Sequence, residues 1–222
     1  MLGNISRYAS KVLLFNASPR SANTLKLLKE AKKGAESVGS EAKIVDLFKL
    51  KYKGCYSCLE CKKIGKPGGC VIKDQLSPYL KEIYDCNGIA IGSPIYMGNF
   101  TSSFYSFFER LIYSNMRYEV GDRMIKFGKK INTGMLITMG APLEALNPYL
   151  EHLNHNIGIL SSFIGPCTVI SNVSQILTPD TKPYEMGMFD IEKSNKWVKE
   201  HDPEVLKQAF DLGVKLATNK PQ

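Results

Sequence analysis

The feature that most limits the fold of this 222-residue chain is an alternation of short apolar runs with longer amphipathic segments. The apolar runs are bounded by turn residues and predict buried strands, and the segments between them carry helical periodicity. The predicted strands cover residues 11–16, 42–47, 88–93, 132–140 and 167–173. The predicted helices cover residues 25–38, 74–84, 100–113, 143–164 and 203–217. This alternation predicts an α/β fold, a doubly wound parallel sheet of five strands with helices on both faces.

The length suits one domain, which we expect to span residues 1–222. Two segments depart from the alternation: a cysteine-rich loop at 54–73 and a turn-rich excursion at 174–200. Residues 115–130 are polar and basic and are expected to form a loop.

No apolar run is long enough to cross a bilayer, and the first eleven residues lack the apolar core of a signal peptide. We therefore expect a cytoplasmic protein without a membrane partner, in a compartment where thiols stay reduced.

The net charge of +8 is concentrated at the start of the chain. Residues 1–70 hold fourteen Lys and Arg against five Asp and Glu. Such a charge can attract an anionic cofactor, an acidic protein or nucleic acid, or it can be the solvated face of a helix. No groove-reading or base-stacking motif accompanies it, so a nucleic-acid partner is not expected.

Candidate site segments follow the first, third and fourth strands, because ligands of open parallel sheets bind at the carboxyl ends of the strands. SPRSANT lies between a strand and a helix start, where backbone N–H groups and the helix dipole favour an anion. Its side-chain donors are Ser18, Arg20, Ser21, Asn23 and Thr24. The alternative is an ordinary helix cap of small polar residues.

The second segment, PIYMGN, brackets an aromatic residue between proline and glycine, and its backbone amides are suited to the edge of a flat ring. Its members are Pro94, Ile95, Tyr96, Met97, Gly98 and Asn99. The third segment is the turn formed by Thr138, Met139, Gly140 and Ala141. A phosphate-sized site beside a flat-ring site indicates a mononucleotide.

VLLFNASPRSANT together with GSPIYMGNFTSSFYSFFERL resembles the flavodoxin-like, NADPH-dependent FMN reductase family, and more narrowly its iron–sulfur flavoprotein branch. The resemblance covers roughly residues 11–173. It implies that the first loop holds the FMN phosphate, that 94–99 holds the isoalloxazine ring and that 138–141 lies against the flavin. One departure is that only Ser21 and Ala22 stand between the arginine and Asn-Thr, where the commonest family loop has three residues.

The resemblance implies an FMN-dependent oxidoreductase that passes electrons from NAD(P)H through bound FMN to free flavin, a quinone or a redox protein. The alternative is a non-enzymatic flavin-binding electron carrier or redox sensor. No catalytic side chain is assigned, because the chemistry belongs to the cofactor. Relatives form homodimers or homotetramers, and the aromatic helix at 100–113 is either a contact face or half of a core-facing helix.

Four cysteines form C-x2-C-x2-C-x8-C: Cys55, Cys58, Cys61 and Cys70. Two readings stay open, a [4Fe–4S] cluster and a metal-free thiol loop. Zinc fits less well because its sites usually have two paired arms, and the expected compartment disfavours a disulfide. In the iron–sulfur flavoproteins the fourth cysteine follows a shorter gap. Cys86 and Cys167 are expected to be buried thiols, and His152 and His155 are not expected to be ligands.

Overall fold

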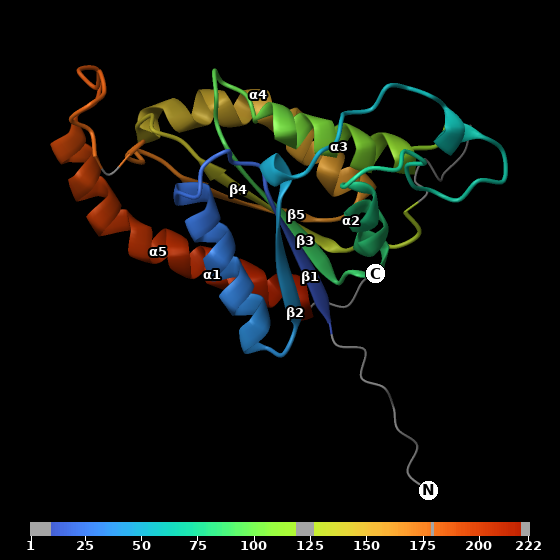
Figure 1. Ribbon diagram of the computed structural model, residues 1–222. Helices are drawn as coiled ribbons and strands as arrows, with labels where there is room; N and C mark the ends of the chain where they lie inside the picture. Colours follow the sequence, from blue (N-terminus) through green and yellow to red (C-terminus); the bar gives the residue numbers. More distant parts are fainter. Residues whose placement is uncertain (1–9, 119–126, 179, 219–222) are drawn as a thin grey trace, which may run out of the picture.

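The computed structural model describes residues 10–118, 127–178 and 180–218, and within them the predicted five-stranded parallel sheet is present (Figure 1). Its strands are β1 (Lys11–Asn16), β2 (Glu41–Asp46), β3 (Gly88–Pro94), β4 (Asn132–Thr138) and β5 (Cys167–Asn172). Their order is β2-β1-β3-β4-β5, and every pair is parallel. This is the flavodoxin-like order, so the predicted fold class is confirmed.

The helices divide between the two faces of the sheet, which makes the fold doubly wound (Figure 1). They are α1 (Asn23–Ser37), α2 (Ser77–Glu82), α3 (Ser102–Asn115), α4 (Leu146–Phe163) and α5 (Ile191–Thr218). Alternate residues of β1 serve the two faces: Leu13 and Phe15 pack with α2, α3 and α4, whereas Val12 and Leu14 pack with α1 and α5. Because β1 is buried on both faces, its sequence is a continuous run of apolar residues.

The aromatic side chains of α3 belong to the core of this chain. Phe104, Phe107 and Phe108 are buried, and the Phe107 ring stacks on Phe15 with ring centroids 4.4 Å apart. The core-facing interpretation of these three residues is therefore the one that the structure supports.

The chain reverses its direction of strand addition between β1 and β3, and this switch point places three loops at one edge. The register aligns Asn16 at the end of β1 with Gly92, and Pro94 at the end of β3 with Thr138. The segments after β1, β3 and β4 consequently emerge side by side.

The C-terminal helix is longer than expected from the sequence. Helix α5 begins at Ile191, so the irregular excursion ends ten residues before the expected end at residue 200. Pro203, taken in the sequence as a helix start, lies inside α5, where its missing N–H costs one hydrogen bond that the long helix tolerates. The expected loop at 115–130 lies partly outside the described residues. No helix in the described ranges is long and apolar enough to cross a membrane.

Candidate flavin site at the carboxyl edge of the sheet

The loop after β1 ends at a helix terminus that no side chain caps. Ala22 is the N-cap of α1, it offers no side-chain acceptor, and the first turn carries no acidic residue. The first backbone N–H groups of the helix therefore lack side-chain partners and carry the positive end of the helix dipole. The buried hydroxyl of Ser18 shapes the loop by accepting a hydrogen bond from Arg20 N at 3.2 Å. This geometry suits an anion.

Two of the predicted phosphate donors are held by the excursion that follows β5. Arg20 Nη1 donates to the carbonyl of Leu177 at 2.6 Å, and Asn23 Nδ2 donates to the carbonyl of Ile176 at 3.1 Å. A guanidinium has five N–H donors, so Arg20 keeps others for a phosphate. Ser21 is exposed in the same loop. These contacts of residues 176–177 with the loop after β1 could not be predicted from the sequence, because they join segments more than 150 residues apart.

The loop after β3 is a tight turn closed by two backbone hydrogen bonds. Tyr96 N donates to Asn99 O at 2.8 Å, and Asn99 N donates to Tyr96 O at 3.0 Å. The two central residues are both left-handed, with φ of 50° at Met97 and 78° at Gly98. Met97 is 96% exposed, so the turn presents its backbone and one apolar side chain at the edge of the site. This exposed backbone suits the rim of a flat ring.

Hydrogen bonds tie the three segments to one another. The hydroxyls of Thr24 and Thr138, both buried, lie 2.7 Å apart. Ile95 N donates to the carbonyl of Thr138 at 2.9 Å, and Thr101 Oγ1 donates to the carbonyl of Ala17 at 2.7 Å. The turn after β4 is stabilised by Gln175, whose backbone N–H donates to the carbonyl of Met139 at 3.0 Å. The loops form one connected edge.

One histidine of α4 contacts the loop after β3. His152 Nε2 on α4 lies 2.9 Å from Asn99 Oδ1, and the hydroxyl of Tyr105 lies 3.4 Å from the same oxygen. Nothing in the sequence indicated this, because it depends on how α4 packs beside the loop after β3. His152 therefore belongs among the side chains that position the turn.

The cysteine loop lies away from this edge, beside the C-terminal half of α3 (Figure 1). Gly54 passes so close to the helix that an added Cβ would be 2.6 Å from Glu109 Oε2. The same oxygen accepts a hydrogen bond from Cys55 N at 3.1 Å. Ser57 and Leu59, on either side of Cys58, are left-handed, with φ of 55° and 62°, so the chain turns sharply before and after this cysteine.

All four cysteines line one hollow between the loop and α3: Cys55, Cys58, Cys61 and Cys70. Its free volume is about 10 Å³, close to that of a single water molecule. Across residues 10–118, 127–178 and 180–218, no three His, Cys, Asp or Glu side chains are grouped closely enough to hold a metal ion. The four thiols therefore border the same hollow, but they are not close enough together to coordinate a metal ion as they stand.

A buried arginine fastens the cysteine loop to α3. Arg110 is 1% exposed, pairs with the carboxylate of Asp74 and donates to the carbonyl of Lys53 at 3.3 Å. Burial by itself would raise the pKa of Asp74, but hydrogen bonds from Arg110 and Ser77 outweigh it and lower the pKa. The pair therefore stays charged at neutral pH.

Burial also lowers the reactivity of two thiols. It raises the pKa of Cys61, and it raises that of Cys86 to about 12, so both are poor nucleophiles at neutral pH. Cys86 is fully buried as expected, whereas Cys167 is only partly buried. No disulfide joins the six cysteines, all of which lie in the described ranges.

The strand order defines a flavodoxin-like α/β protein, with three loops grouped at its switch point. The model of the NADPH-dependent FMN reductases matches residues 10–169. The chain belongs to the NADPH-dependent FMN reductase family, an FMN-binding family, so the predicted family is confirmed.

Among curated proteins, the chain is similar to an iron–sulfur flavoprotein of Archaeoglobus fulgidus, with 31% identity over 126 residues. That match covers 56% of this chain and 60% of the relative. A second relative, the iron–sulfur flavoprotein MJ1083 of Methanocaldococcus jannaschii, is 32% identical over 101 residues, or 45% of this chain and 51% of the relative. The chain thus aligns with only about half of each relative's length.

Solved structures support the fold. An NAD(P)H:quinone oxidoreductase from Methanothermobacter marburgensis superposes with a TM-score of 0.67 at 14% identity, covering 95% of this chain and 98% of that one. The azoreductase AzrA superposes with a TM-score of 0.59 at 14% identity, covering 93% and 100%. At such identities the likeness shows the fold alone.

Proposed function

We propose that this chain is an enzyme that passes electrons from NAD(P)H through bound FMN to an acceptor such as a quinone, free flavin or a redox protein. The observation that carries the proposal is the uncapped N-terminus of α1, beside Arg20, at the switch point between β1 and β3. Membership of the FMN reductase family supports it.

The residues of the carboxyl edge fit FMN in type and position. Ser18, Arg20, Ser21, Asn23 and Thr24 would hold the phosphate with the amides of α1. Residues 94–99 would present backbone groups to the ring, and 138–141 would lie against it. When bound, FMN supplies the capacity to accept a hydride and release electrons singly or in pairs.

The chain's own part is binding and orientation. The hydrogen bonds among Thr24, Thr138 and Ile95 fix the phosphate loop relative to the ring loop before any ligand arrives. His152 and Tyr105 steady Asn99, which holds the turn that faces the ring. A site fixed in advance spends little binding free energy on ordering its loops.

A non-enzymatic electron carrier or redox sensor is the second candidate. The two are separated by anaerobic reduction of the FMN-loaded protein with NADPH or NADH, followed by turnover with a quinone in air-free buffer. An enzyme bleaches the flavin absorbance and oxidises many equivalents of nicotinamide per chain. A carrier leaves the flavin oxidised until dithionite is added, and that result would overturn the enzymatic proposal.

We also propose that the cysteine loop binds a [4Fe–4S] cluster, in a compartment such as the cytoplasm where its thiols remain reduced. Support comes from four cysteines around one hollow, from Ser57 N donating to Cys55 Sγ at 3.4 Å, and from the iron–sulfur flavoproteins among its relatives. The hollow must widen for a cluster to enter, because its free volume is about 10 Å³.

Iron and sulfide analysis of anaerobically reconstituted protein tests this site. About four irons and four sulfides per chain are expected. Cys58→Ser should lose iron while retaining FMN, and Cys86→Ser, which changes a thiol outside the loop, should retain both. Reconstituted wild-type protein with stoichiometric FMN and no iron would contradict the cluster and support a metal-free thiol loop.

A further inference from the structure

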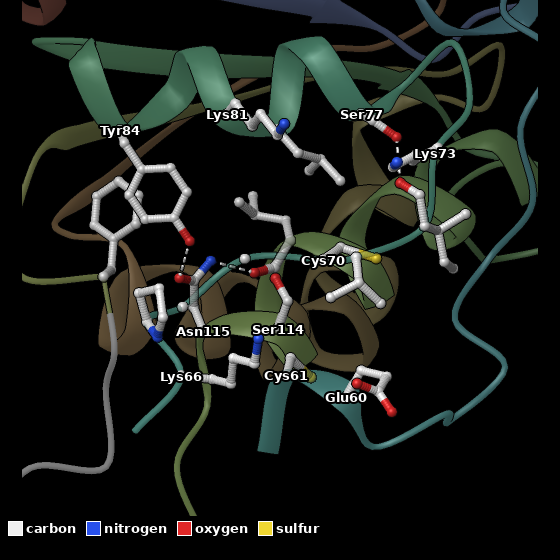
Figure 2. Close-up of a pocket in the computed structure, with 18 residues that line it drawn as sticks. Glu60, Cys61, Lys66, Cys70, Lys73, Ser77, Lys81, Tyr84, Ser114 and Asn115 are labelled. Atoms are coloured by element: carbon white, nitrogen blue, oxygen red, sulfur yellow. Dashed lines mark hydrogen bonds between the residues drawn. The ribbon is translucent and has the colours of Figure 1, made fainter. Parts of the chain in front are cut away.

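A large cavity lies between the end of the cysteine loop, α2 with the 3-10 turn that follows it, and the end of α3 (Figure 2). Its volume is about 720 Å³, within the range of small-molecule sites. None of its lining residues belongs to the three loops of the carboxyl edge. We refer to it below as the lysine-rimmed cavity.

The interior of the lysine-rimmed cavity is apolar and aromatic. Leu80, Leu111 and Phe127 line it, and the rings of Tyr84 and Phe127 lie with centroids 5.1 Å apart. The hydroxyl of Tyr84 donates to Asn115 Oδ1 at 2.5 Å, and Asn115 Nδ2 donates to the carbonyl of Leu111 at 2.8 Å, so both side chains have partners within the protein (Figure 2). Such walls favour a flat apolar ring over a sugar or a peptide.

The rim of the cavity is positively charged. Lys73 and Lys81 are exposed at its edge, and neither makes an ion pair with another described residue. Lys66 lies on the opposite side, toward α3 (Figure 2). Among the described residues that line the cavity, the carboxylate is that of Glu60, which is paired with Lys63 at 2.7 Å. A ligand that enters the cavity therefore meets ammonium groups at the mouth and hydrocarbon inside.

We propose that the lysine-rimmed cavity binds a small planar aromatic carboxylate, with the ring against Tyr84 and Leu111 and the carboxylate at Lys73 and Lys81. This goes beyond the proposed function, because the site shares no residue with the flavin edge and its ligand is neither flavin nor cluster, although Cys61 and Cys70 border both this cavity and the hollow proposed for the cluster. Cys61 and Cys70 also line the cavity, so the ligand lies beside the cysteine loop.

Calorimetric titration of the FMN-loaded full chain with 2-naphthoate tests the proposal. Saturable binding is expected. The neutral analogue 2-naphthalenemethanol should bind more weakly, because it has no carboxylate to pair with Lys73 and Lys81. The double variant Lys73→Gln/Lys81→Gln should weaken naphthoate binding about tenfold, the combined effect of two exposed charge pairs.

The matched control is Lys29→Gln/Lys33→Gln, which removes the same charge from α1 beside a different cavity of about 750 Å³. It should change naphthoate affinity by less than about twofold, because exposed charges a Debye length away are screened. Arg20→Ala/Thr24→Ala should also retain naphthoate binding, which separates this site from the flavin edge. Absence of saturable binding, equal affinity in the Lys73/Lys81 variant, or loss of binding in the Arg20/Thr24 variant would overturn the assignment.

Discussion

The carboxyl-edge loops and the cysteine loop are built in opposite ways. The edge loops leave adjacent strands and are joined by buried hydrogen bonds such as that between Thr24 and Thr138, 2.7 Å apart. The cysteine loop leaves the sheet after β2 and is fastened to the side of α3 through Arg110 and Glu109. Sheet topology thus assembles the first site, whereas a few side-chain contacts hold the second.

The difference bears on what each region needs from its ligand. The edge has its donors and turns in place, so FMN is expected to bind without large rearrangement. The cysteines face one hollow of about 10 Å³, and a cluster would have to order the loop around itself. Stability, flavin affinity and iron content should therefore respond separately to substitutions in the two regions.

The largest expected effect is the loss of the anchor between the cysteine loop and α3. Arg110→Ala leaves the carboxylate of Asp74 without its partner and should lower the free energy of unfolding by about 3 kcal/mol. Urea denaturation measures it. Lys63→Ala, which removes an exposed pair with Glu60, is the control and should cost less than about 1 kcal/mol. A similar small loss in both variants would show that Arg110 does not anchor the loop.

A smaller effect is expected at the turn of the carboxyl edge. Gly98→Ala places a side chain at φ of 78° and should destabilise the protein by roughly 1 kcal/mol. It should also shift the absorbance of bound FMN. Gly158→Ala in α4, where an added Cβ meets nothing within 4 Å, should instead stabilise by roughly 0.5–1 kcal/mol. Effects of the same sign at both glycines would contradict the left-handed turn.

The smallest expected effect is the acid response of the cysteine-loop anchor. Because the pKa of Asp74 is lowered in the folded protein, its contribution to stability is present above the ordinary carboxyl pKa of about 4 and is lost as the pH falls through the folded value. Wild-type protein should lose more stability than Asp74→Asn between about pH 6 and pH 3. Parallel pH profiles would exclude a charged Asp74–Arg110 pair.

Much of the fold, and the grouping of three loops at one edge of the sheet, could be predicted from the sequence. The strand predicted at residues 11–16 coincides with β1. A short run that is apolar on both faces is typical of a strand buried inside a parallel sheet. The loops after β1, β3 and β4 could be grouped because the topology of parallel sheets brings their ends together.

The remaining features depend on contacts between distant segments. No local sequence pattern marks the residues that make these contacts. Examples are the contacts of Arg20 with Leu177, of Asn99 with His152 and of Asp74 with Arg110. The start of α5 at Ile191 was missed because Pro203 looks like a helix boundary and is tolerated inside a long helix.

The central claim, that FMN binds at the carboxyl edge through the loop after β1, is tested most directly by titrating apoprotein with FMN and following flavin fluorescence. Arg20→Ala/Thr24→Ala should weaken binding by roughly 1–3 kcal/mol for each lost contact. Lys207→Ala, which removes an exposed lysine of α5, should leave the affinity unchanged. Equal affinity for FMN in the wild type and in the Arg20/Thr24 variant would remove this loop from the flavin site and contradict the account.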